Sequence, residues 1–205
     1  MKRYLTLCIA AGLAAALAAP AVSYAQTTIT LENTNSFNPP SATLDLGAGS
    51  FDWEWGPGGV GTLDIHNVVQ DDGLFTSGDP VRSDPDRFSV TASAGSFPYF
   101  CVVHIGMEGE VSVRPVAGVT AAGGGTSGGT RVAWADATTT TGNRYDVRYK
   151  AGKKWKLWKK KTSKLSGTFG RNGKPVKLKR RVKLQARSRA GKSRSDWSPT
   201  LVLQP

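Results

Sequence analysis

Apolar and polar residues alternate along most of the chain with the two-residue period of β-strands. In the first part the alternation covers 27–31, 42–46, 87–91 and 110–113, and Trp53 and Trp55 alternate in a further stretch. Clusters of Gly and Pro separate these stretches, as in 38–40 and 56–59. Short strands at this spacing, without a helical period, predict an all-β domain of the sandwich or barrel type.

The second part of the chain has the same period with a different chemistry. Alternation covers 131–135, 144–150, 155–158, 181–187 and 200–203, with Lys and Arg at the polar positions. Apolar residues on one face and charged residues on the other are typical of antiparallel sheets that are solvated on one side. The pattern therefore predicts a second, smaller β-domain.

Charge separates these two parts. Residues 26–116 contain 12 acidic and 3 basic side chains, whereas 131–205 contain 3 acidic and 22 basic ones. Between them, 117–130 is rich in Gly, Ala and Thr and has no charge. Such a segment cannot bury a core, so it predicts a flexible linker. Across it, the opposite charges predict a loose association that salt would weaken.

The first 25 residues have the composition of a secretory signal. Lys2 and Arg3 precede an apolar run from Leu5 to Ala19, and small residues flank Tyr24. This pattern predicts an exported protein, cleaved near Gln26, that is periplasmic, attached to the cell envelope or extracellular. An uncleaved membrane anchor is the alternative. No later segment is apolar enough to span a bilayer.

The residues that could bind a transition metal are scarce. The chain has two Cys, two Met and two His. With the initiator Met1 and Cys8 of the apolar run set aside, four remain: His66, Cys101, His104 and Met107. This count excludes a disulfide scaffold, a zinc finger and an iron–sulfur protein. It also leaves no histidine base for a Ser or Cys nucleophile, so we expect the protein not to be an enzyme.

The four residues have a spacing that fits one metal ion. Cys101, His104 and Met107 follow the pattern Cys-x2-His-x2-Met in a short loop between two strands, and His66 lies at a strand end. Two imidazoles, a thiolate and a thioether suit copper, whereas zinc gains little from a thioether. Each residue alone is more often a core or solvated side chain. Together they predict one copper site.

The first domain resembles the plastocyanin/amicyanin type of small blue copper protein, the cupredoxins. The matching residues are His66-Asn67-Val68-Val69, Phe75, Ser77, Gly78, Asp79, Tyr99, Cys101, His104, Gly106, Met107, Gly109 and Val111. The resemblance implies an eight-stranded Greek-key sandwich and one type 1 copper held by the four residues above. It also implies electron transfer, with Asn67 hydrogen-bonded to the ligand loops. Val103 departs from the family, which often has Pro there.

The same resemblance implies that His104 reaches the surface. Its neighbours Val102, Val103 and Ile105 are apolar. Exposed apolar patches on small domains commonly mark contact sites, and redox partners meet through small interfaces. We therefore expect these three residues to form a rim at which a redox protein docks.

The second domain resembles a fibronectin type III domain. The matching stretches are 145–149, 182–193 and Trp197-Ser198-Pro199, although Arg180 stands where the family has a Tyr. Lysines gather around its tryptophans Trp155 and Trp158: Lys153, Lys154, Lys156, Lys159, Lys160 and Lys161. Export argues against nucleic acid as the partner. Anionic cell-wall polymer, anionic lipid or an acidic protein fits better, with an inert basic surface as the alternative.

The sequence thus predicts an exported electron carrier with a type 1 copper site and a basic module that associates with the envelope or a partner. Two alternatives stay open. The protein could bind or deliver copper without shuttling electrons, or it could be an envelope adhesion protein whose copper site is incidental.

Overall fold

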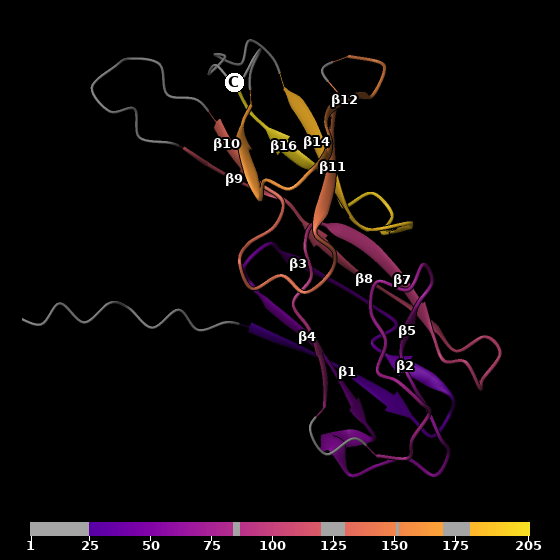
Figure 1. The fold of residues 1–205 in the computed structure, drawn as a ribbon. Helices are drawn as coiled ribbons and strands as arrows, with labels where there is room; N and C mark the ends of the chain where they lie inside the picture. The colour runs from indigo at the N-terminus through magenta and orange to yellow at the C-terminus, as the bar shows by residue number, and fades with distance from the viewer. Residues whose placement is uncertain (1–24, 84–86, 120–129, 151, 170–180) are drawn as a thin grey trace, which may run out of the picture.

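The computed structural model describes residues 25–83, 87–119, 130–150, 152–169 and 181–205, and these form two β-units stacked end to end (Figure 1). The prediction of an all-β chain is confirmed: among the described residues the helical element is one 3-10 turn, η1 (Pro57–Gly59). Within these ranges no helix has the length and apolarity needed to cross a bilayer. The expected signal segment, apart from Ala25, and Arg180 lie outside the described residues.

The first unit is a sandwich of two four-stranded sheets. One has the order β2-β1-β4-β6 and the other β3-β8-β7-β5. In each sheet one neighbouring pair is parallel, β1 with β4 and β3 with β8, and the others are antiparallel. The strands are β1 (Ala25–Glu32), β2 (Ser36–Asn38), β3 (Ser41–Asp45), β4 (Gly49–Trp55), β5 (Val69–Gln70), β6 (Phe88–Val90), β7 (Gly95–Phe100) and β8 (Glu108–Arg114).

Aromatic side chains fill the space between the two sheets. Trp53 and Trp55 are fully buried, as expected for core residues. The Trp53 ring meets Tyr99 of the facing sheet edge-on, with centroids 5.2 Å apart, an arrangement that aromatic pairs favour. Cys101 and Met107 belong to the same buried cluster, so this core extends to the end of β7 that carries the metal-binding motif.

The second unit also has two sheets. Three strands form one, in the order β13-β10-β9, and β12-β11-β14 form the other, with β15 and β16 both paired to β14. The core between them contains Trp134, Val147 and Leu184, all fully buried. The strands are β9 (Val116–Val119), β10 (Thr130–Ala133), β11 (Arg144–Lys150), β12 (Lys156–Thr162), β13 (Ser166–Thr168), β14 (Val182–Ala190), β15 (Ser193–Arg194) and β16 (Leu201–Leu203).

The structure corrects the boundaries of the predicted linker. Residues 117–119 and Thr130 lie in β9 and β10, which pair antiparallel with Gly118 opposite Arg131. Main-chain hydrogen bonds hold this pair, and they need no large side chain. The linker prediction for 120–129 falls outside the described residues.

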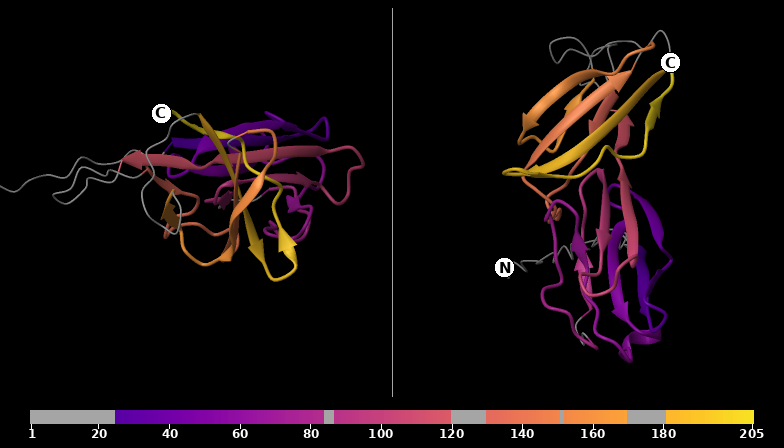
Figure 2. Two further views of the ribbon diagram at one scale, coloured as in Figure 1. Left: turned by 90° about the horizontal axis from the view of Figure 1, so that it is seen from above. Right: turned by 90° about the vertical axis from the view of Figure 1, so that its right-hand side faces the viewer.

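A buried interface, not a loose electrostatic contact, joins the two units (Figure 2). Ala94 N–H donates to the Trp134 carbonyl (2.7 Å), and Ser96 exchanges two backbone bonds with Asp196. Ser93 and Thr141, both fully buried, bond through Ser93 N–H and the Thr141 hydroxyl (2.9 Å). These bonds are neutral, and those of Ala94 and Ser93 lie among fully buried residues, so the expectation of a salt-weakened association is wrong.

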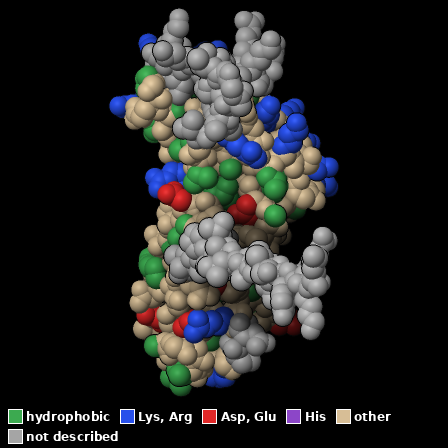
Figure 3. Space-filling view, turned by 90° about the vertical axis from the view of Figure 1, so that its left-hand side faces the viewer, with side chains coloured by type: hydrophobic (Ala, Val, Ile, Leu, Met, Phe, Trp, Pro, Cys, Tyr) green, Lys and Arg blue, Asp and Glu red, His purple; other side chains and the backbone are tan. Residues whose placement is uncertain are grey.

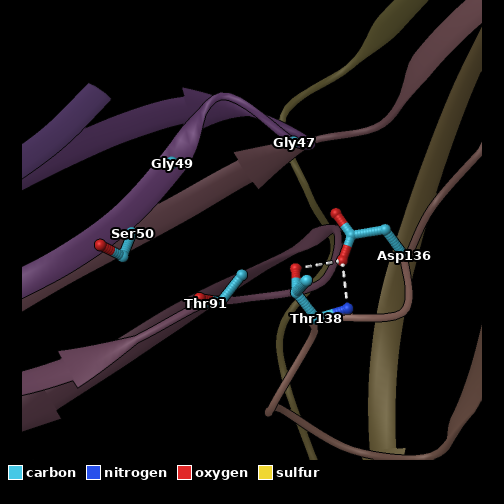
Figure 4. A pocket seen from close by; sticks show the side chains of 6 residues that line it. All are labelled: Gly47, Gly49, Ser50, Thr91, Asp136 and Thr138. Carbon is cyan, nitrogen blue, oxygen red and sulfur yellow. Dashed lines mark hydrogen bonds between the residues drawn. The ribbon is translucent and has the colours of Figure 1, made fainter. Parts of the chain in front are cut away.

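Beside this interface lies a small cavity of about 170 Å³ (Figure 4). Gly47, Gly49, Ser50 and Thr91 of the first unit line it, and the second unit contributes Asp136 and Thr138. The Asp136 carboxylate accepts hydrogen bonds from the amide and hydroxyl of Thr138 at 2.9 and 2.7 Å. It thereby caps its own turn, which accounts for its place at the cavity wall.

The two units keep the charge difference that the sequence shows. On the face in Figure 3, Lys and Arg side chains gather on the upper half of the molecule, which is the second unit. Lys153 and Lys154 precede β12, and Lys156, Lys159, Lys160 and Lys161 lie on it. Because β12 is an edge strand, its lysines also discourage pairing with another chain.

Candidate metal centre

Three of the four predicted ligand residues meet at one end of the first unit. The donor atoms of His66, Cys101 and His104 all lie within 4.8 Å of one another. The Cys101 sulfur is 3.5 Å from Nδ1 of His104, and the two imidazole centroids are 4.6 Å apart. His66 comes from the segment before β5, and the other two come from the loop between β7 and β8.

The loop from Cys101 to Met107 is closed by its own backbone. Met107 N–H donates to the His104 carbonyl, and Cys101 N–H donates to the Met107 carbonyl, both at 3.1 Å. Gly106 has φ = 82°, a left-handed conformation that glycine adopts without strain. Met107 is 1 % exposed within the same cluster as Cys101. The tight turn therefore places Met107, the fourth predicted ligand, next to Cys101 and His104.

Asn67 joins the two ligand-bearing segments. Its side-chain oxygen accepts the N–H of Val102 at 3.0 Å, and its side-chain nitrogen donates to the Gly78 carbonyl at 2.8 Å. Ser77 and Val68 add two further bonds, both of 2.9 Å, between the His66 segment and the stretch that contains Gly78. The bond to Val102 holds the residue after Cys101 against the residue after His66.

The burial of His66 shows that the residues fit a metal ion. The side chain is fully buried, and neither ring nitrogen finds a hydrogen-bond partner among the described residues. Burial lowers the pKa of His66, the nearby His104 lowers it further, and Asp64 opposes both. The ring is thus held neutral, the form that binds metals, and a buried polar group without a partner is costly unless something occupies its lone pair.

The predicted docking residues are exposed around this cluster. Val102 is 53 % exposed, Val103 43 % and Ile105 fully exposed. Leu63 and Ile65, at 77 % and 39 %, come from the His66 segment, and the sequence pattern did not single them out. The sequence could have indicated them, because Leu63 and Ile65 lie close to His66, and the His66 segment and the Cys101–Met107 loop must meet at the same end of the unit to bind one metal ion.

Carboxylates surround the neighbouring end of β8. Asp71, Glu108, Tyr99 and Phe100 help to line an open groove beside the metal-binding loop. Burial raises the pKa of Asp71, and the charges of Glu108, Asp72 and Asp196 raise it further. Asp71 and Glu108 make this groove acidic.

No protein-family model and no curated protein matches the chain. Among solved structures it is similar to a novel purple cupredoxin from Nitrosopumilus maritimus, at 24 % identity and a TM-score of 0.36, over 43 % of this chain and 99 % of that one. A reduced amicyanin mutant gives 20 % identity and a TM-score of 0.34, over 50 % and 90 % of the two chains.

A third similar structure is a copper-containing nitrite reductase from Thermus scotoductus, at 20 % identity and a TM-score of 0.31. It is matched over 44 % of this chain and 22 % of its own length, so this chain spans about a fifth of that enzyme.

The class of protein follows from the topology and the cluster. The first unit is a cupredoxin-like sandwich with a His–Cys–His candidate copper site at the end of β7, and a separate β-sheet domain follows it. Soft sulfur and imidazole donors of this kind suit copper.

Proposed function

We propose that the protein is an exported, non-enzymatic type 1 copper protein that transfers single electrons between redox partners of the cell envelope. The observation that carries this proposal is the fully buried His66 imidazole, which has no hydrogen-bond partner in the described part of the chain and lies beside the Cys101 thiol and the His104 ring. Copper, when bound, supplies the one-electron change between Cu(I) and Cu(II). His66, Cys101, His104 and Met107 would hold it.

The surrounding residues have distinct roles in this function. The Asn67 bonds and the closed loop hold the ligand residues in place, which reduces rearrangement when the charge of the site changes. The sandwich core excludes water from Cys101, which is 3 % exposed. Burial and ligation would together protect an otherwise reactive thiol outside the cell.

The His104 side chain supports an exit for the electron. It is 15 % exposed, whereas His66 is fully buried, so the His104 ring is the imidazole that reaches the surface. Val102, Val103 and Ile105 surround this exit with apolar side chains that a redox partner would cover. A small apolar contact suits a brief encounter, since weak redox complexes bury little surface.

The basic unit is proposed as a fibronectin type III-like module that associates with an anionic envelope surface. Its two antiparallel sheets, of three and five strands, support this assignment, and so do the largely exposed lysines on and before β12. Lysines near an anionic surface are attracted at physiological salt over distances of about 8 Å.

The test of the copper proposal is the visible spectrum of the full chain loaded with Cu(II). We expect an intense visible band that a reductant bleaches and an oxidant restores. Cys101→Ser should abolish the band, because the thiolate is lost from the ligand set. Ser112→Ala, which removes a buried polar atom from β8 away from the cluster, should keep it.

Two results would contradict electron transfer. A colourless adduct, or loss of copper on reduction, would indicate copper delivery instead. A band that persists unchanged in Cys101→Ser would overturn the site assignment itself.

A further inference from the structure

The segment that carries His66 is fixed on both sides of Asp64. The Thr62 hydroxyl lies 2.7 Å from the Asp64 carbonyl and 3.0 Å from the Arg82 carbonyl. Leu63 N–H donates to the Asn33 side chain at 2.7 Å. His66 exchanges two backbone bonds with Val81, of 2.8 and 2.9 Å. The backbone between Thr62 and His66 is therefore a rigid support.

The carboxylate of Asp64 connects this support to the other ligand loop. Its Oδ1 accepts the N–H of Ile65 at 3.2 Å, which orients the group. Its Oδ2 lies 3.5 Å from Nε2 of His104. The Asp64 side chain is 55 % exposed, and His104 is 15 % exposed. One short segment thus supplies His66 directly and contacts the ring of His104 as well.

The contact distinguishes the two nitrogens of the His104 ring. A carboxylate beside one ring nitrogen favours the tautomer that carries the proton there, which leaves the lone pair on the other. In this ring the other nitrogen is Nδ1, and it faces the Cys101 sulfur at 3.5 Å. Asp64 would therefore present the lone pair of Nδ1 to the centre of the cluster.

Asp64 also brings a negative charge close to the proposed metal. As metal ligands, the other residues of the cluster would supply one thiolate and neutral imidazoles. A carboxylate that contacts a ligand from outside raises the basicity of that ligand and favours the more highly charged oxidation state of a metal. Half of the Asp64 side chain faces water, which weakens this effect without removing it.

We propose that Asp64 is a positioning residue for His104, which fixes the tautomer and orientation of the ring and lowers the reduction potential of the site. The effect on the reduction potential rests on the proposed copper function. The effect on the tautomer and orientation of the His104 ring does not depend on copper and can be tested in the metal-free protein.

Two variants separate the charge of Asp64 from its contact. Asp64→Asn removes the charge but keeps an oxygen that can accept from Nε2–H, and Asp64→Ala removes both. Nitrogen-15 NMR of the metal-free full chain should show the Nε2–H tautomer of His104 in the wild type and in Asp64→Asn. A mixture of tautomers is expected in Asp64→Ala. An identical tautomer in all three proteins would overturn the positioning role.

The second measurement is the reduction potential of the copper-loaded proteins. Loss of an outer partner of a metal ligand typically costs tenfold or more in metal affinity. If this loss falls on Cu(II) alone, the potential rises by about 59 mV for each factor of ten. We expect such a rise in both Asp64 variants.

Glu108→Gln is the matched control, because Glu108 adjoins the ligand Met107 in sequence, whereas the carboxylate paired with the His104 imidazole among the described residues is that of Asp64. An equal rise in this control would show that only net charge matters and would contradict the inference. If the wild-type protein fails to give the visible band, the copper function fails, while the NMR result still decides the role of Asp64.

Discussion

Asp146 shows how one residue decides the charge balance inside the basic unit. It is 3 % exposed on β11 and accepts hydrogen bonds from the Lys161 N–H (2.8 Å), Arg187 (3.0 Å) and Arg189 (3.0 Å). Burial alone would raise the pKa of Asp146, but these hydrogen bonds and the charge of Arg187 outweigh it and hold the pKa below its usual range. The carboxylate thus pairs with two arginines of β14, and its single charge offsets part of theirs.

This arrangement predicts a loss of stability in acid. Because the folded state lowers the pKa of Asp146, the unfolded state binds more protons below about pH 4, and the stabilisation present at neutral pH is lost as the pH falls through the folded pKa. Asp146→Asn should cost about 3 kcal/mol at pH 7, since it leaves two arginines without their partner. The cost should shrink at pH 3.

Urea unfolding at the two pH values measures this difference. The exposed Asp196→Asn is the control and should change the free energy of unfolding little at either pH. A cost for Asp146→Asn that is equal at pH 7 and pH 3 would show that the carboxylate charge is not what stabilises the unit.

At the same scale, the sequence predicted which residues meet at the metal centre but not what orients them. His66, Cys101, His104 and Met107 stood out because few other soft donors exist in the chain. Asp64 and Asn33 did not, because a carboxylate or an amide in a loop is common. Their roles depend on contacts between segments that are far apart in sequence, such as Asn33 with Leu63.

At the scale of elements, strand β9 marks the limit of the pattern. Most strands of the first unit were expected because apolar and polar residues alternate along them. Val116–Val119 has Ala and Gly at its centre and no polar alternation, so the composition of 117–119 favoured a linker. It forms a strand because β10 offers it a ladder of main-chain partners, from Val116 opposite Ala133 to Val119 opposite Thr130.

Hydrogen exchange can test the pairing of β9. The amides of 116–119 that bond to β10 should exchange slowly, whereas a flexible tether would exchange at the rate of an unfolded peptide. Ala117→Pro removes one N–H from the middle of the strand and should release this protection in both β9 and β10. The visible band of the copper-loaded protein should be unchanged, since the site lies in the other unit. Fast exchange in the wild type would restore the linker interpretation.

At the scale of the whole molecule, the interface makes the two units one body. Gly95 begins β7 at this interface, and a Cβ there would collide with Ser195 of the second unit. Ala94 is buried within the core of the second unit. Because β7 runs from this contact to Cys101, the basic unit and the candidate metal centre lie at opposite ends of one strand (Figure 1). The basic unit would thus hold the cupredoxin-like unit by the end that lies away from His104.

This separation allows the basic surface to be tested independently of copper. Vesicles of phosphatidylcholine with and without phosphatidylglycerol probe lipid binding, and soluble polyphosphate probes binding to a polymer. Each lysine near an anionic surface contributes about 1 kcal/mol, so changing Lys156, Lys159, Lys160 and Lys161 to Gln should weaken binding by up to about a thousandfold. Higher salt should weaken the wild type as well.

The control removes equal charge elsewhere on the same unit, through Gln at Arg131, Arg144, Lys183 and Lys192. An equal loss of binding in this control would mean that the β12 lysines form no particular site. Absence of binding to either probe would leave the surface as an inert solvated one. Binding to vesicles but not to polyphosphate would identify lipid as the partner.

The sequence by itself determined the all-β class, the boundary between acidic and basic parts and the four candidate ligands. These follow from local period and from composition, which need no knowledge of distant contacts. Only the tertiary structure decided that β9 is a strand, that Ser93, Ala94 and Thr141 join the units, and that Asp64 contacts His104. Each of these depends on hydrogen bonds or packing between segments that are far apart in sequence. Such contacts produce no periodic pattern of apolar and polar residues from which they could be predicted.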